Sequence, residues 1–167
     1  MTRLSLALVL AAVLSGPAAS AAPQCAVAQG AKAPPFSLSM ADGSEGVVLG
    51  RALAKGVPVV VIFWAWDCVP CGKELPQIQR IANELGPKAS FLLIHDGPDE
   101  EKMKKRLAEL NVTLPSASDD SRMKEERYCV DSLPRTFVID KGGIVRNIFK
   151  QFDEPALRDA LAKLGAK

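Results

Sequence analysis

The sequence predicts an α/β fold, a single sheet with helices on its faces, and three observations support this prediction. The chain has 167 residues, 48% of them hydrophobic, which suits one domain with a single sizeable core. Val57–Trp64 is a continuous apolar run rich in β-branched residues, as in a strand buried on both faces. From this run onward, the segments follow the order β-α-β-α, an irregular stretch, then β-β-α.

The first expected strands precede this apolar run. Phe36–Ser39 and Val47–Leu49 flank Ala41–Ser44, whose Asp-Gly pair is typical of a hairpin turn. After the apolar run, hydrophobic residues recur at helical spacing from Leu75 until Gly86-Pro87 ends the pattern. The later elements are expected at Ser90–Ile94 (strand), Asp99–Leu110 (helix), Asp120–Tyr128 (short helix), Arg135–Asp140 and Ile144–Lys150 (hairpin) and Leu157–Leu164 (helix).

The N-terminus has the pattern of a secretory signal peptide. Arg3 supplies a short positive region, Leu4–Leu14 is apolar, and small residues follow the break at Ser15–Pro17. Because a membrane-spanning helix needs about 20 apolar residues, cleavage is favoured over an uncleaved membrane anchor. We therefore expect a signal peptide at residues 1–21, a flexible N-terminal arm at 22–35 and the folded domain at 36–167.

Charge and histidine content argue against several classes of function. The 21 basic and 19 acidic residues leave a formal net charge of +2, too small for nucleic acid or polybasic membrane binding. His95 is the only histidine in the sequence, which argues against a His-rich metal site and a Ser/His hydrolase. Because His95 follows the expected strand Ser90–Ile94, we expect it to be a loop residue without a metal role.

The chemistry is expected at Cys68 and Cys71, a Cys-x-x-Cys pair placed where the buried strand gives way to a helix. Two intervening residues bring the sulfurs close enough to close a small disulfide ring. Cys68 lies at the helix N-terminus, where free N–H groups and the helix dipole stabilise a thiolate. We therefore expect Cys68 to attack a client disulfide, and Cys71, the more buried partner, to resolve the mixed disulfide.

Two other interpretations of this cysteine pair remain open. A zinc half-site would need further ligands from His95, Cys25 and Cys129, which offer no second pair at ligand spacing. An inert structural disulfide is the other alternative, although such bonds rarely lie at a strand-to-helix junction beside a tryptophan. Export to an oxidising compartment favours the redox interpretation.

Three segments together resemble a known family. Phe63–Cys71 (Phe-Trp-Ala-x-x-Cys-x-Pro-Cys), Lys73–Pro76 and Leu133–Asp140 resemble the TlpA/ResA group of exported thioredoxin-like thiol-disulfide oxidoreductases. The resemblance extends from Pro34 to Leu164. It implies a thioredoxin-like fold, in which a central mixed sheet is flanked by helices, with an N-terminal β-hairpin extension.

The resemblance also implies roles for individual residues. It implies a cis peptide bond before Pro134, which faces the disulfide and presents the Leu133 backbone to an extended client strand. It implies that Glu74 tunes the cysteines and shuttles protons, because Ile62 stands where thioredoxins proper have a buried aspartate. The alternative for Glu74 is a solvated surface residue on a helix. The expected client-binding residues are Trp64, Trp66 and Leu133.

The sequence departs from this group at two places. Asp67 stands where family members usually carry tryptophan, with Trp66 one position earlier. Residues 132–137 lack the Gly-x-Pro-Glu-Thr-Phe pattern of relatives dedicated to cytochrome c maturation, which weakens apocytochrome c as the client. Asp67 is expected either to raise the pKa of Cys68 by its charge or merely to cap the helix.

The combined prediction is a monomeric reductase of client-protein disulfides in the bacterial periplasm. It needs no cofactor beyond the Cys68–Cys71 disulfide and receives electrons from a membrane thiol-disulfide donor; apocytochrome c and copper-protein thiols are candidate clients. A DsbA-type oxidase is one alternative, although Val69-Pro70 offers no histidine between the cysteines. A copper-binding or metal-delivery module for a respiratory oxidase is another, although such carriers use Cys-x-x-x-Cys.

Cys25 and Cys129 are expected to form a second, structural disulfide. Both lie outside the redox motif, the expected compartment is oxidising, and some members of the resembled family tie the N-terminal arm to the region before the cis proline. The alternative is a pair of free or intermolecular thiols, because Cys25 lies on the expected flexible arm.

Overall fold

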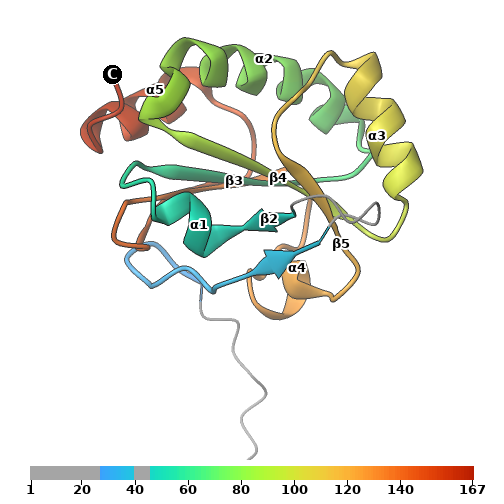
Figure 1. Ribbon diagram of the computed structural model, residues 1–167, viewed down its shortest axis with the longest axis horizontal. Coiled ribbons are helices and arrows are strands. Elements are labelled where there is room, and N and C mark those ends of the chain that lie inside the picture. The colour runs from blue at the N-terminus through green and yellow to red at the C-terminus, as the bar shows by residue number, and fades with distance from the viewer. Residues whose placement is uncertain (1–26, 40–45) are drawn as a thin grey trace, which may run out of the picture.

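The protein is represented by a computed structural model that describes residues 27–39 and 46–167 (Figure 1). The strands in these residues are β1 (Ser37–Leu38), β2 (Val47–Val48), β3 (Val59–Trp64), β4 (Ser90–Asp96), β5 (Ser116–Asp119), β6 (Arg135–Ile139) and β7 (Val145–Phe149). The central sheet has the strand order β5-β4-β3-β6-β7. β4 pairs in parallel with both β3 and β5, whereas β6 is antiparallel to β3 and to β7. The sheet is therefore mixed.

Helices cover both faces of this sheet (Figure 1). In the described residues they are α1 (Leu49–Leu53), α2 (Val69–Leu85), α3 (Glu100–Glu109), α4 (Met123–Glu126) and α5 (Glu154–Lys163), with a 3₁₀ turn at Gly86–Lys88. One face packs against α2, α3 and α5. The other face packs against α1, α4 and the antiparallel pair β1–β2, which is the expected N-terminal hairpin. The turn of that hairpin lies outside the described residues.

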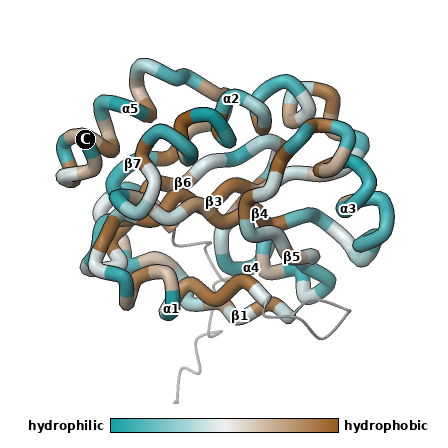
Figure 2. Tube along the Cα trace, turned by 45° about the horizontal axis from the view of Figure 1, so that its top comes forward, coloured by the Kyte–Doolittle hydropathy of each residue, from teal (hydrophilic) through white to brown (hydrophobic). Residues whose placement is uncertain are grey.

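The centre of the fold is β3, in which every residue is fully buried. Its side chains alternate between the two core clusters, one on each face of the sheet. Figure 2 shows the hydrophobic segments along β3 and β4 inside the molecule and hydrophilic segments on the outer helix α3. The continuous apolar pattern predicted a strand covered on both faces, and this prediction is confirmed.

Two elements and one residue differ from the sequence prediction. β5 lies in the stretch that was expected to be irregular, but its short, polar Ser-Ala-Ser-Asp sequence pairs with β4 as an edge strand. β4 extends to Asp96, so His95 lies opposite Trp64 of β3 on one side and Ser118 of β5 on the other. The prediction of a loop position for His95 was wrong: the residue is inside a strand and fully buried. The short helix α1 was also missed.

The segment before β1 is part of the fold from residue 27 onward. Val145 N–H donates to Ala31 O (2.9 Å), and Gly30 N–H donates to Val145 O (2.7 Å). Tyr128 Oη–H donates to Pro34 O (2.7 Å), and Ala33 is buried. Within the expected flexible arm at residues 22–35, residues 30–33 are therefore held by pairing with residues 143–145, at the beginning of β7. The expected signal peptide at residues 1–21 lies outside the described residues.

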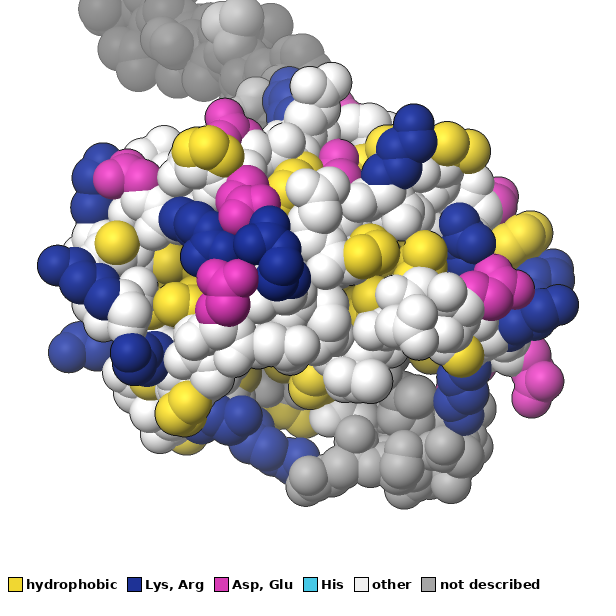
Figure 3. All heavy atoms as spheres, turned by 90° about the horizontal axis from the view of Figure 1, so that it is seen from above, with side chains coloured by type: hydrophobic (Ala, Val, Ile, Leu, Met, Phe, Trp, Pro, Cys, Tyr) yellow, Lys and Arg dark blue, Asp and Glu magenta, His cyan; other side chains and the backbone are white. Residues whose placement is uncertain are grey.

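The outer surface of α2 and α5 carries an ion-pair network. Arg80 and Arg158 each contact both Glu84 and Glu154. Figure 3 shows basic and acidic side chains intermixed on this face, with apolar side chains between them. Such exposed pairs contribute about 0–1 kcal/mol each, so they add little to stability. Within residues 27–39 and 46–167, no helix has the length and apolarity that crossing a membrane requires.

Candidate active site

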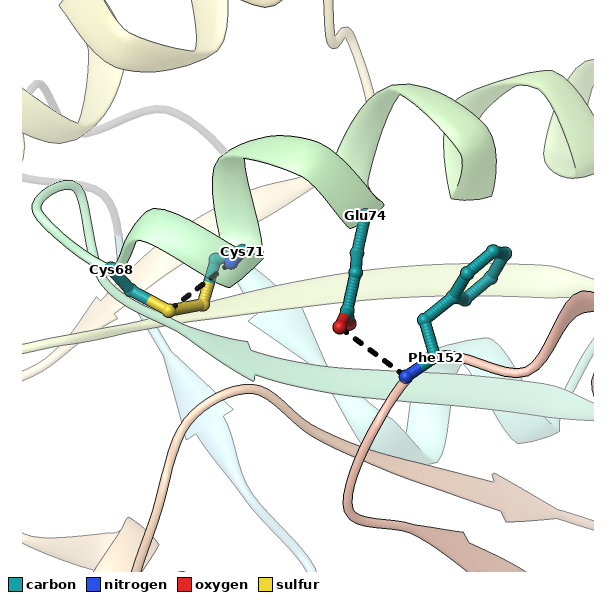
Figure 4. The surroundings of a disulfide bond; sticks show 4 residues. All are labelled: Cys68, Cys71, Glu74 and Phe152. Atoms are coloured by element: carbon teal, nitrogen blue, oxygen red, sulfur yellow. Dashed lines mark hydrogen bonds between the residues drawn. A yellow bond between two sulfur atoms is a disulfide. The ribbon is translucent and has the colours of Figure 1, made fainter.

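The disulfide lies at the junction between β3 and α2. Cys68 and Cys71 are bonded through their sulfurs, with Cα atoms 5.2 Å apart. Cys68 is the N-cap residue of α2, and its Sγ accepts a hydrogen bond from the Cys71 backbone N–H at 3.3 Å (Figure 4). Pro70 has no N–H group, so it does not compete for the sulfur. The N-terminal backbone of α2 therefore directs a donor at Cys68 Sγ, as the thiolate hypothesis requires.

The two cysteines differ in exposure. Cys71 is fully buried and belongs to the core cluster under α2, whereas Cys68 is only half-buried. Val69, between them, is 70% exposed. A client sulfur can therefore approach Cys68 from solvent, whereas Cys71 has no surface exposed to solvent.

Glu74 lies one helical turn after Cys71, on the side of α2 that faces the sheet. Figure 4 shows its carboxylate extending from the helix toward the segment that carries Phe152. The Phe152 backbone N–H donates to Glu74 Oε1 at 3.3 Å. Burial raises the pKa of Glu74 above its usual value, and this hydrogen bond offsets part of the rise. The Glu74 side chain, one turn after Cys71 on α2, is thus half-buried rather than fully solvated.

The segment before β6 reaches the same end of the sheet. The Leu133–Pro134 peptide bond is cis. β6 begins directly afterwards, with Arg135 opposite Phe63 in the antiparallel pairing to β3. β6 runs antiparallel to β3, so β6 begins at the end of the sheet where β3 finishes. The loop before Pro134 and the loop leading to Cys68 therefore lie at the same end of the sheet. Leu133 and Cys68 both pack against the core cluster under α2.

The two tryptophans have different environments. Trp64 is fully buried in the core cluster under α2, so the expectation that it contacts a client directly is corrected. Trp66 is half-buried, and Lys102 Nζ lies 4.7 Å from the centre of its ring. Asp67 is exposed. Because Cys68 is the N-cap, the capping role considered for Asp67 was wrong.

Residues 29–148 match the AhpC/TSA family. The chain belongs to this family. It is 33% identical over 128 residues to thiol-disulfide oxidoreductase ResA of Geobacillus thermodenitrificans, covering 74% of this chain and 70% of that protein. It is 28% identical over 125 residues to thioredoxin-like protein YneN of Bacillus subtilis, covering 73% and 71% respectively. The chain is therefore a thiol-disulfide oxidoreductase of the ResA type.

A solved structure supports the fold of this family member. The thioredoxin domain of a thiol-disulfide oxidoreductase from Bacteroides vulgatus superposes with a TM-score of 0.71 at 23% sequence identity. The match covers 81% of this chain and 99% of that domain. The thioredoxin-like fold with its N-terminal hairpin, implied by the sequence motifs, is confirmed.

Three features of this oxidoreductase were not found from the sequence. Phe152 is 78 residues from Glu74, so no local pattern could identify its N–H as the carboxylate's partner. His95 packs edge-on against Trp64, with ring centres 5.3 Å apart, and burial lowers its pKa. Arg135 is buried beside the cis proline. The only sequence signal for it was a charge directly before the apolar residues of β6.

The expected structural disulfide involves the N-terminal segment. Cys25 lies outside the described residues, so its pairing with Cys129 stays a prediction. Cys129 is not a free thiol. It directly follows Tyr128, whose hydroxyl group binds Pro34 O and thus connects this region with the start of the domain.

Proposed function

We propose that this oxidoreductase reduces disulfides of client proteins. The observation that supports this proposal most strongly is the unequal exposure of the cysteines: Cys68 is partly accessible and Cys71 is buried. In addition, Val69 and Pro70 place no cationic or hydrogen-bonding side chain between the sulfurs. Strongly oxidising relatives of DsbA stabilise the thiolate of their reduced form, and the residues between these two cysteines add no side chain that would do so.

The proposed reaction has two sulfur transfers. The Cys68 thiolate attacks one sulfur of the client disulfide, the client bond breaks, and its other sulfur leaves and takes up a proton. Cys71 then loses its proton and attacks Cys68 Sγ, which releases the second client thiol. The client gains two electrons and two protons, and the protein ends with the Cys68–Cys71 disulfide.

In this reaction Glu74 is the base that accepts the proton that the Cys71 thiol loses. The carboxylate is one turn away on the same helix, and its raised pKa makes it a better base than an exposed glutamate. On this proposal the N–H of Phe152 orients the carboxylate, leaving its second oxygen for the proton.

The remaining proposals concern the setting of the reaction. We place the protein in the bacterial periplasm, as a monomer without a cofactor beyond its own disulfide. A membrane thiol-disulfide donor would return it to the dithiol form. Apocytochrome c and copper-protein thiols are candidate clients, and Leu133 and Trp66 are the proposed contacts for the client chain.

The reduction potential of the Cys68–Cys71 pair tests the direction. Equilibration with glutathione buffers, followed by thiol alkylation and mass spectrometry, gives this potential directly. A value of about −200 mV or lower supports a reductase, whereas about −120 mV, near that of DsbA, would make the protein an oxidase. Reduction of insulin by the pre-reduced protein is the accompanying activity test.

A further inference from the structure

Arg135 is an unusual residue for its position. It follows the cis proline directly and begins β6, opposite Phe63. Its side chain is only 7% exposed. Burying a guanidinium group in a strand is costly unless its donors are used, and an apolar residue would suit the strand equally well. A reason for arginine at this position must therefore come from what it contacts.

The contacts of Arg135 are with the segment that precedes the proline. Its Nη2 donates to Asp131 Oδ1 and to Ser132 Oγ, the latter at 2.9 Å. Ser132 Oγ also donates to Asp131 Oδ1 at 3.1 Å, so all three residues are hydrogen-bonded to one another. Asp131 is 74% exposed. The buried arginine thus fixes two residues of a surface loop to the rigid first residue of β6.

The location of this network suggests its use. The fixed residues lead directly into Leu133, which packs against the same core cluster as Cys68. The loop lies at the end of the sheet where β3 finishes, which is also the end that carries Cys68. Ordering a backbone segment costs conformational entropy, so a loop that is already ordered binds an extended chain more tightly.

We propose that Arg135 is a positioning residue that holds residues 131–133 ready to bind the client chain beside Cys68. This inference rests on the proposed function. It concerns recognition of an extended polypeptide and not the sulfur chemistry. A small disulfide without a polypeptide chain should therefore react independently of Arg135.

The test compares two substrates in single-turnover reactions of the pre-reduced protein. Insulin supplies a disulfide within a polypeptide, and bis(hydroxyethyl) disulfide supplies one without. For Arg135→Gln, the second-order rate constant with insulin should fall about tenfold, as expected for losing a charged hydrogen bond. The rate constant with the small disulfide should stay within about twofold of the wild-type value. The reduction potential should stay unchanged.

Arg146→Gln is the matched control. Arg146 also pairs with an aspartate, its Nε lying 2.7 Å from Asp140 Oδ2, but at the opposite end of β6. This variant should leave both rate constants unchanged. If Arg135→Gln fails to fold, the double variant Asp131→Asn, Ser132→Ala removes the same network from its exposed side and should show the same selective loss.

Three results would overturn the inference. They are an unchanged rate with insulin, an equal loss with both substrates, and an equal selective loss in Arg146→Gln. Wild-type protein that reduces neither substrate would instead refute the proposed function, and the inference with it.

Discussion

The redox site is built from two segments that are constructed in different ways. The segment from β3 into α2 places Cys68, Cys71 and Glu74 by backbone geometry, since all three belong to one helix and its cap. The segment around Pro134 is placed by side chains, through the network of Arg135 and the hydrogen bond of Tyr128. The first segment carries the chemistry, and the second is proposed to hold the client. We therefore expect changes in the two segments to have different effects.

The largest effects are expected at the cysteines themselves. Cys68→Ser should lower turnover by about a thousandfold or more, because a serine hydroxyl does not exchange with a disulfide. Cys71→Ser should still attack but should accumulate a mixed disulfide with insulin, since nothing resolves it. Non-reducing gels and mass spectrometry measure both outcomes. A mixed disulfide that accumulates in Cys68→Ser instead would reverse the assigned roles.

Glu74→Gln should have the next largest effect, and this effect should fall on the sulfur chemistry rather than on client binding. Glutamine keeps an oxygen for the Phe152 N–H but does not take up a proton, so resolution of the mixed disulfide should slow about tenfold or more. Stopped-flow measurement of client thiol release reports this step. Glu84→Gln, an exposed change on the same helix, is the control and should leave the rate unchanged.

The same variant makes a prediction about pH. Because the pKa of Glu74 is raised, the folded protein holds this proton more tightly than the unfolded chain does. Its contribution to stability is therefore fully present below about pH 4 and is lost as pH rises through the raised pKa. Glu74→Gln removes this dependence, so its stability relative to wild type should increase from about pH 4 to 7. Urea unfolding at a series of pH values measures this difference. If the free energies of unfolding of the two proteins change with pH in the same way, the assignment is contradicted.

Tyr128→Phe tests the contact that ties the second segment to the start of the domain, and it should affect stability rather than the redox pair. Tyr128 is buried, and its hydroxyl donates to Pro34 O at 2.7 Å. Phenylalanine keeps the ring contacts with Phe36 and Phe63 but leaves the carbonyl without this donor. The free energy of unfolding should fall by about 1–2 kcal/mol, and the reduction potential should stay the same. A shifted potential would show that the two segments are not independent.

The contrast between the segments also explains what the sequence could predict. The spacing of Cys68, Cys71 and Glu74 fixes their arrangement, because residues three apart on a helix share a face. The apolar run of β3 fixes the strand before them. Local patterns in the sequence therefore predicted where these three residues lie, whereas the role of Glu74 was implied by the family resemblance.

The rest of the site depends on contacts between distant residues. Phe152 reaches Glu74 across 78 positions, and Tyr128 reaches Pro34 across 94. His95 is buried between Trp64 of β3 and Ser118 of β5, and β5 has no apolar alternation that would predict a strand. Such positions follow from the assembled sheet, so only a structure could identify them.

Asp67→Asn should produce the smallest effect, and it tests whether charge near the helix N-terminus matters at all. Asp67 precedes the N-cap Cys68 and is exposed, so its carboxylate opposes the Cys68 thiolate through solvent. Asparagine removes the charge and keeps the shape. The pKa of Cys68 should then fall, and the thiolate-containing reduced state should become more stable.

A more stable reduced state means a more positive reduction potential, by about 30 mV for each 1.4 kcal/mol. Because solvent screens an exposed charge, we expect a rise smaller than about 30 mV. Asp159→Asn is the control: this aspartate is also exposed, but it lies on α5 and pairs with Lys163. Thiolate absorbance gives the pKa, and glutathione equilibration gives the potential. If neither value changes in Asp67→Asn, the helix backbone alone sets the thiolate's stability and Asp67 has no electrostatic role.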